Sequence, residues 1–287
     1  MAAAIPVWSG RVAVEIADVL AAAADARQHD DRRWKAARDF QLMTIMPYTP
    51  SPAGSPQLAS NEVDCWSANL DDSPETSTRF YTTLTCDERN RSARFRFERD
   101  RQRFIAARGV VRDILGHYLR TDPGDITFAH NAFGKPDLSP VLGSRLKFNL
   151  SHSAGLALVA IAADSNVGVD LEYIQTQSET AEIARHFFAS TEVEQLNALP
   201  SHLYAEAFFS CWTKKEAYLK ARGEGLATPL HSFAVPLTTD PARTPVNLHG
   251  WSLYTLRPAP GYAGALAIEG TGWRLRQWQW TKASRYE

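Results

Sequence analysis

The feature of this sequence that most restricts its fold is an order of elements that occurs twice. In each half, an alternating segment typical of a strand precedes a long segment with helical spacing, and further strand-like segments follow. The first long helix is predicted over 87–120. The second is predicted over 204–222, where Gly223 supplies a stop signal. The repeated order predicts an α+β fold built from a duplicated unit.

A Pro-rich stretch separates the N-terminus from this repeated part. Residues 47–56 contain four prolines, too many for a helix or an inner strand. We therefore predict an N-terminal extension with a Pro-rich linker over residues 1–60. Because no candidate functional residue lies in it, we expect this extension to be dispensable for chemistry.

The charge balance and the cysteines restrict the partners and the compartment. The 287 residues include 31 Lys and Arg against 32 Asp and Glu, which does not suit bulk attraction to nucleic acid or an anionic membrane. Three distant cysteines with no C-x-x-C pair indicate neither a disulfide framework nor a zinc knuckle, and they favour a reducing, cytoplasmic location. The apolar stretch over 156–163 is far shorter than the ~20 residues of a membrane helix, so membrane insertion is not expected. Glu15 and Asp18 interrupt the apolar N-terminal stretch over 12–24, so export is not expected either.

Two carboxylates alternate along the strand predicted over 167–172. Asp170 and Glu172 share one face of this strand. Neighbouring carboxylates repel each other unless a cation lies between them, and oxygen ligands of this kind suit Mg²⁺. The alternative interpretation is a solvated polar strand face.

A third carboxylate interrupts an aromatic helical stripe. Phe208, Trp212, Glu216 and Lys220 follow one another at intervals of four residues. A buried carboxylate is costly unless it is paired or binds a metal. The alternative is a surface Glu216–Lys220 pair that contributes about 0.3–0.5 kcal/mol, but the neighbouring Trp212 favours a functional role.

The segment 148–153, Phe-Asn-Leu-Ser-His-Ser, carries candidate phosphate ligands. Ser151 and His152 diverge on an extended backbone, and no G-x-S-x-G turn presents a nucleophile. Lys135, in a Gly-Lys-Pro turn, is a point charge suited to phosphate. A hydrogen-bonded turn histidine and a solvated lysine are the alternatives. The arginines between 89 and 112 are diluted by acidic residues, which favours a solvated helix face with a few phosphate-binding arginines over a nucleic-acid patch.

Taken in order, these segments resemble the 4'-phosphopantetheinyl transferases of the Sfp type. The resemblance covers about residues 62–256 and rests on several motifs in the family's order. The matching segments are 107–112 in the Arg-rich helix, 134–136, 148–153, 167–172, 187–192, 209–221 and 223–226.

The resemblance implies a fold and a reaction. The fold is a pseudo-twofold monomer of two similar α/β halves, 61–165 and 166–287, with the active site in the cleft between them. Such enzymes transfer the 4'-phosphopantetheine group from coenzyme A to a serine of an apo acyl or peptidyl carrier protein and release 3',5'-ADP. Mg²⁺ is the implied cofactor, and Mn²⁺ can replace it.

The resemblance also implies roles for individual residues. Those that match metal ligands are Asp170, Glu172 and Glu216, of which Asp170 also belongs to the coenzyme A site. Those that match binders of the coenzyme A phosphates and adenosine are Lys135, Ser151 and His152, with Arg91 and Arg103 near the 3'-phosphate and Lys220 at the pyrophosphate. The implied base that deprotonates the substrate serine is Glu216 or a metal-bound water under its influence.

Two other functions use the same residues. A Mg²⁺-dependent nuclease or phosphatase would need a basic track that the charge balance does not offer. A catalytically inactive module that binds coenzyme A or a carrier protein is the second, although all three carboxylates are present. For an active transferase, the basic and aromatic segment 185–188 is the predicted docking site of an acidic, partly apolar carrier helix.

Overall fold

The structure is a computed structural model that describes residues 48–50, 55–71, 74–175, 179–225, 228–237 and 245–281. Most of the predicted extension, residues 1–47 and 51–54, lies outside these ranges. No helix among the described residues is both long enough and apolar enough to cross a membrane.

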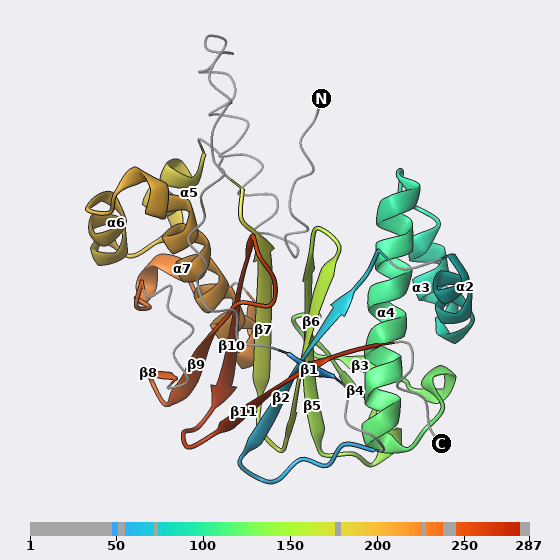
Figure 1. The fold of residues 1–287 in the computed structure, drawn as a ribbon. Coiled ribbons are helices and arrows are strands. Elements are labelled where there is room, and N and C mark those ends of the chain that lie inside the picture. Colours follow the sequence, from blue (N-terminus) through green and yellow to red (C-terminus); the bar gives the residue numbers. More distant parts are fainter. Residues whose placement is uncertain are drawn as a thin grey trace.

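The two halves of the chain have the same topology (Figure 1). The first comprises β2 (Glu62–Asn69), α2 (Pro74–Thr83), α3 (Cys86–Ser92), α4 (Glu98–Leu119), β5 (Leu146–Ser153) and β6 (Leu156–Ala163). The second comprises β7 (Val167–Tyr173), α5 (Thr180–Phe187), α6 (Ser190–Asn197), α7 (Ser201–Arg222), β9 (Trp251–Leu256) and β10 (Tyr262–Glu269). The strand orders β2-β6-β5 and β7-β10-β9 are equivalent and antiparallel, which confirms the predicted α+β fold of two similar halves.

The remaining strands are short or join distant parts of the chain. They are β1 (Thr49–Pro50), β3 (Phe128–His130), β4 (Pro136–Leu138), β8 (Val246–Leu248) and β11 (Arg274–Gln279). Strand β11 pairs in parallel with β2, so the end of the second half lies in the sheet of the first (Figure 1). Short 3₁₀ helices occupy Pro123–Asp125, Pro140–Leu142 and Leu230–Ser232. The division of the chain at residue 165 stays a prediction.

The single helix predicted over 87–120 is wrong, because the chain turns between α3 and α4. A capping box starts α3: Glu88 N donates to Thr85 Oγ1, and Thr85 N donates to the Glu88 carboxylate. After α3, the ring of Phe95 packs on Phe104 with centroids 5.3 Å apart. This apolar contact holds the turn.

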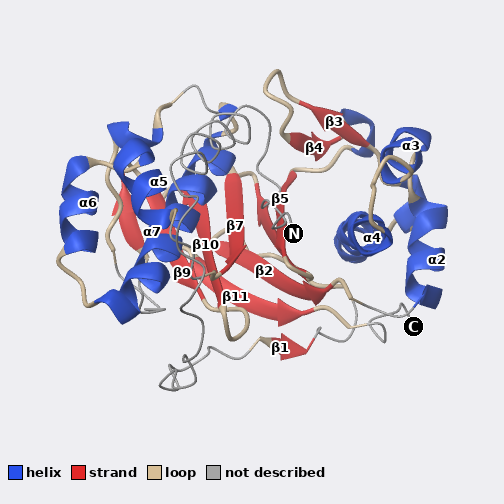
Figure 2. Cartoon of the chain, turned by 90° about the horizontal axis from the view of Figure 1, so that it is seen from above, coloured by secondary structure: helices blue, strands red, loops and turns tan. Residues whose placement is uncertain are grey.

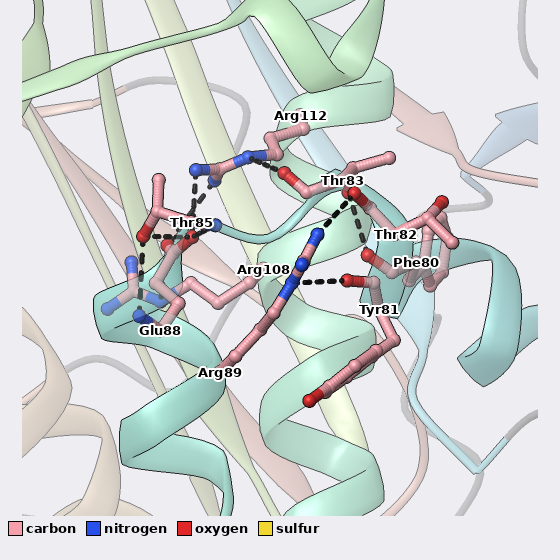
Figure 3. Close-up of polar contacts among 9 residues, drawn as sticks. All are labelled: Phe80, Tyr81, Thr82, Thr83, Thr85, Glu88, Arg89, Arg108 and Arg112. Carbon is pink, nitrogen blue, oxygen red and sulfur yellow. Dashed lines mark hydrogen bonds and ion pairs between the residues drawn. The ribbon is translucent and has the colours of Figure 1, made fainter.

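A buried arginine ties the three helices of the first half together. Arg112 of α4 is fully buried; its Nε donates to the carbonyl of Thr83 at 3.0 Å, and its guanidinium pairs with Glu88 at 2.8 Å (Figure 3). Arg89 of α3 donates to the carbonyls of Tyr81 and Thr82 (Figure 3). These bonds fix α3, and with it Arg91, relative to α4.

Three apolar clusters form the core. One lies between α4 and the first sheet, one surrounds α7, and the third lies between the two sheets. Helices α4 and α7 stand on either side of β5 and β7 (Figures 1 and 2). Strands β5 and β7 belong to different sheets, and β5 side chains supply hydrogen bonds between them. The polar residues discussed next lie around this junction.

Candidate active site

Gly168 determines how closely α7 approaches β7. A Cβ atom at this position would lie 2.2 Å from the carbonyl oxygen of Ala217 and 2.3 Å from the backbone nitrogen of Ala221. Only a residue without a side chain permits this contact. The close packing brings Glu216 and Lys220 of α7 into electrostatic contact with Asp170 of β7.

The three predicted metal ligands are buried together. Asp170 is 3% exposed, and Glu172 and Glu216 are each 9% exposed. Glu172 interacts electrostatically with both other carboxylates. Neither a solvated strand face nor a surface Glu216–Lys220 pair describes groups with this burial.

Lys220 is the cation of this cluster. Its Nζ lies 2.5 Å from Asp170 Oδ1 and donates to Ser151 Oγ at 3.2 Å. Burial alone would lower the pKa of Lys220, but the carboxylates of Asp170, Glu216 and Glu172 raise it above the usual value. The lysine therefore stays charged beside the carboxylates.

For Glu172 and Glu216, the attraction of Lys220 does not offset burial and repulsion between the carboxylates. Burial, followed by repulsion from Asp170, raises the pKa of Glu172 to about 8 and that of Glu216 to about 7. Two buried oxygens, Asp170 Oδ2 and Glu216 Oε1, have no hydrogen-bond partner among the described residues. Such oxygens and raised pKa values fit a site that receives a cation.

The donor set suits Mg²⁺, although the carboxylates are not arranged as a closed cluster. Within the described ranges, no three Asp, Glu, His or Cys side chains are gathered closely enough to hold a metal as they stand. The unpartnered oxygens belong to two different elements, β7 and α7. Binding therefore requires these side chains to close around the ion.

A second, basic cluster surrounds His152 on β5. Burial, and then the charges of Arg108, Lys220, Arg91 and Arg103, lower the pKa of His152 to about 4. The imidazole is neutral at pH 7, and four cations converge on it. Such a set of donors suits an anion of two or more charges.

Arg108 is a member of this basic cluster that the sequence analysis did not single out. The guanidinium groups of Arg91 and Arg108 lie 5.4 and 5.6 Å from the centroid of the Phe104 ring. The sequence does indicate that Arg108 lies one helical turn after Phe104, on the same face of the helix. Its position opposite β5 depends on the packing of α4 on the sheet.

Arg103 and Lys135 have partners inside the protein. Arg103 makes a bidentate ion pair with Asp71, with both N–O distances 2.6 Å. Lys135 Nζ donates to the carbonyls of Ala221 and Val167 at 3.0 and 3.1 Å, and burial lowers its pKa to about 8. Lys135 thus joins the first half to the C-terminal end of α7, beside Lys220.

A buried ion pair that the sequence did not indicate holds α7. Lys215 is fully buried and lies 2.8 Å from Glu192 of α6, and its Nζ also donates to two carbonyls between 230 and 233. Phe187 and Phe188, expected at a docking surface, are buried in the core around α7. Of the segment 185–188, only Arg185 and His186 are exposed.

Two family models match consecutive parts of the chain. The model of the 4'-phosphopantetheinyl transferase superfamily matches residues 166–267, and that of the N-terminal part of 4'-phosphopantetheinyl transferases matches residues 69–166. The 4'-phosphopantetheinyl transferase HetI of Nostoc sp. is 40% identical over 229 residues, which cover 78% of this chain and 94% of HetI. The chain belongs to the 4'-phosphopantetheinyl transferase superfamily. The resemblance inferred from the motifs is therefore confirmed.

A second relative connects this transferase with the Sfp type. The 4'-phosphopantetheinyl transferase Sfp of Bacillus subtilis is 31% identical over 168 residues, 58% of this chain and 73% of Sfp. The transferase is an enzyme of this type, and coenzyme A is the substrate from which the family takes the phosphopantetheine group. The nuclease and phosphatase alternatives find no support.

Proposed function

We propose that this transferase moves the 4'-phosphopantetheine group of coenzyme A onto a serine hydroxyl of an apo acyl or peptidyl carrier protein in a Mg²⁺-dependent reaction. One observation carries the proposal: the two clusters share Lys220, which donates to Ser151 and Asp170 and whose charge also lowers the pKa of His152. One molecule with a phosphate at one end and a pyrophosphate nearby can occupy both clusters.

The basic cluster supports binding of the 3'-phosphate. Arg91, Arg108 and His152 supply the donors, and Arg103 is held beside them by Asp71. A phosphate dianion bound here would raise the pKa of His152 and favour its protonated form. We also retain Lys135 and Ser151 as contacts of the coenzyme A phosphates, since both are close to Lys220 or its neighbour Ala221.

The carboxylate cluster supports the chemistry. Asp170, Glu172 and Glu216 would hold Mg²⁺, which would neutralise charge on the pyrophosphate. Lys220 lies in the same cluster, and its ammonium can bind a pyrophosphate oxygen and stabilise the charge of the departing 3',5'-ADP. Catalysis of this kind depends on positioning and charge neutralisation more than on a protein nucleophile.

The proton of the substrate serine needs an acceptor. The serine oxygen forms a bond to the phosphorus next to the pantetheine arm, and the bond from that phosphorus to the bridging oxygen breaks. The electron pair leaves with 3',5'-ADP. Glu216 is the proposed acceptor of the serine proton, because its carboxylate belongs to the cluster and its Oε1 is unpartnered among the described residues.

We further propose a compartment and an oligomeric state for the enzyme. Cys65, Cys86 and Cys211 are free thiols, which suits a reducing, cytoplasmic compartment. We propose that the enzyme acts as a monomer, with both clusters formed by residues of the same chain.

Mass spectrometry of a carrier protein tests the proposed function. An apo carrier incubated with the enzyme, coenzyme A and Mg²⁺ is expected to gain one phosphopantetheine, roughly 340 Da. Chelation of the metal is expected to abolish the gain. An unchanged carrier mass with several different apo carriers would support the inactive binding module instead.

A further inference from the structure

Three alternate residues of β5 form the joint between the two halves. The side-chain oxygens of Asn149, Ser151 and Ser153 accept the backbone N–H groups of residues 169, 171 and 173 of β7, at 2.8, 3.3 and 3.1 Å. Strand side chains alternate between faces, so these three point to the same side of β5. These oxygens accept the N–H groups of β7 in the way that the backbone carbonyls of a neighbouring strand would.

Two of these three residues also contact the carboxylates of β7. Ser151 Oγ donates to Asp170 Oδ1 at 3.0 Å, and Ser153 Oγ donates to Glu172 Oε2 at 3.1 Å. A hydroxyl group has one proton and two acceptor positions. When the backbone N–H of β7 occupies one acceptor position, the hydroxyl proton remains for the carboxylate. The joint therefore orients both hydroxyl groups.

Asp170 has a second partner besides Ser151, whereas Glu172 depends on Ser153 for its hydrogen bond. Asp170 is also held by the ammonium of Lys220. For Glu172, the hydrogen-bond donor that the described part of the chain provides is Ser153. Ser153 further binds the backbone nitrogen of Tyr173, directly after Glu172. One hydroxyl group thus fixes both the side chain and the following peptide of this carboxylate.

We infer that Ser153 is a positioning residue that orients Glu172 for the metal, whereas Asn149 serves the joint alone. This inference rests on the proposed metal site. Residues that hold a metal ligand by a hydrogen bond commonly contribute 10–100-fold to metal affinity. Asn149 is a matched control, because its Oδ1 accepts a β7 N–H in the same way and contacts none of the three carboxylates in the described contacts.

The experiment compares the full-length wild type with Ser153→Ala, Ser153→Thr and Asn149→Ala. Thermal unfolding is followed during Mg²⁺ titration without coenzyme A, and turnover is measured against Mg²⁺ concentration. We expect both alanine variants to unfold at lower temperature, since each leaves a β7 N–H without its acceptor. Only Ser153→Ala is expected to need about 10–100-fold more Mg²⁺ for half-saturation in both measurements. Ser153→Thr keeps the hydroxyl and is expected to restore the wild-type value.

The outcomes separate this inference from the metal site itself. A Ser153→Ala enzyme that unfolds earlier but keeps the wild-type Mg²⁺ half-saturation would overturn the positioning role alone. A wild type whose stability and turnover ignore Mg²⁺ would overturn the proposed metal site, and the role of Ser153 with it. Should Ser153→Ala not fold, Ser153→Cys keeps the size with a weak donor, and the same weakened Mg²⁺ response is expected.

Discussion

Gly168 of β7 and Ala221 of α7 approach so closely that a Cβ atom on Gly168 would stand 2.3 Å from the Ala221 nitrogen. The contact is between backbones, so a flexible side chain cannot move aside to relieve it. It fixes the distance between the strand that carries Asp170 and Glu172 and the helix that carries Glu216. The geometry of the proposed active site therefore depends on a residue without a functional group.

Gly168→Ala is expected to damage both stability and activity. The added methyl group must push α7 away from β7, and overpacking of this kind costs about 1–3 kcal/mol of the free energy of unfolding. Turnover is expected to fall as well, because Glu216 and Lys220 move with α7. Urea unfolding and the carrier assay measure the two effects. Gly124→Ala is the control, since its Cβ would meet only the Asp122 side chain, at 3.2 Å. A fully active Gly168→Ala enzyme would contradict this view of the packing.

Glu216→Gln is expected to lower turnover by about 10²–10³-fold, the usual effect of removing one preorganised charged group. The amide keeps the size of the side chain, so the circular dichroism spectrum is expected to stay that of the wild type. Glu194→Gln, at an exposed position of α6, is the matched control. Turnover of Glu216→Gln at the wild-type rate would remove Glu216 from the chemistry.

The basic cluster is expected to discriminate between coenzyme A and dephospho-coenzyme A. Each charge-assisted hydrogen bond to the 3'-phosphate strengthens binding by about 1.5–3 kcal/mol, and dephospho-coenzyme A cannot form these bonds. Arg108→Ala and His152→Ala are expected to bind the two ligands more equally, and calorimetry measures both affinities. Arg185→Ala, on the exposed side of α5, is expected to retain the preference. Equal affinities in the wild type would show that the 3'-phosphate binds elsewhere.

The contribution of Glu172 and Glu216 to the stability of the metal-free protein is expected to fall as the pH rises from about 5 to above 8. The pKa values of Glu172 and Glu216 rise from 4.5 to about 8 and about 7 on folding, so the folded state binds more protons than the unfolded state in this range. Ionisation of these buried groups therefore destabilises the metal-free protein. The Mg²⁺ affinity is expected to increase over the same range, because the metal competes with protons.

Melting temperatures between pH 5 and 9, with and without Mg²⁺, test this pH dependence. Comparison with Glu216→Gln measures the contribution of that carboxyl together with its effect on the pKa of Glu172, which Glu216 raises. A wild type and a Glu216→Gln variant with identical pH profiles would show that Glu216 ionises normally.

Two truncations test the predicted extension. Tyr48 packs against the core between the sheets, Leu58 packs against the core beneath α4, and β1 pairs with β11. A chain that starts at Tyr48 is expected to keep wild-type stability and transfer activity. A chain that starts at Asn61 is expected to remain active but to melt at lower temperature, because it lacks these contacts. Loss of transfer by a folded Asn61 variant would show that the extension takes part in the reaction.

The sequence alone determined the features that depend on local periodicity. Alternation along 167–172 put Asp170 and Glu172 on one strand face, and four-residue spacing put Glu216 and Lys220 on one helical stripe. The repeated order of strands and long helices predicted two similar halves, and the order of the motifs predicted the family. These inferences needed only neighbours along the chain.

The tertiary structure decided which partner each polar group has. Lys135 and Lys220 both lie near predicted phosphate-binding segments, yet Lys135 donates to backbone carbonyls and Lys220 pairs with Asp170. Both partners of Ser153, the Glu172 carboxylate and the Tyr173 backbone nitrogen, lie on β7. Arg108 lies near His152 because α4 packs on the sheet that contains β5. Periodicity fixes the face of an element on which a side chain lies. Burial and pairing depend on contacts between residues far apart in sequence, and these form only when the elements pack.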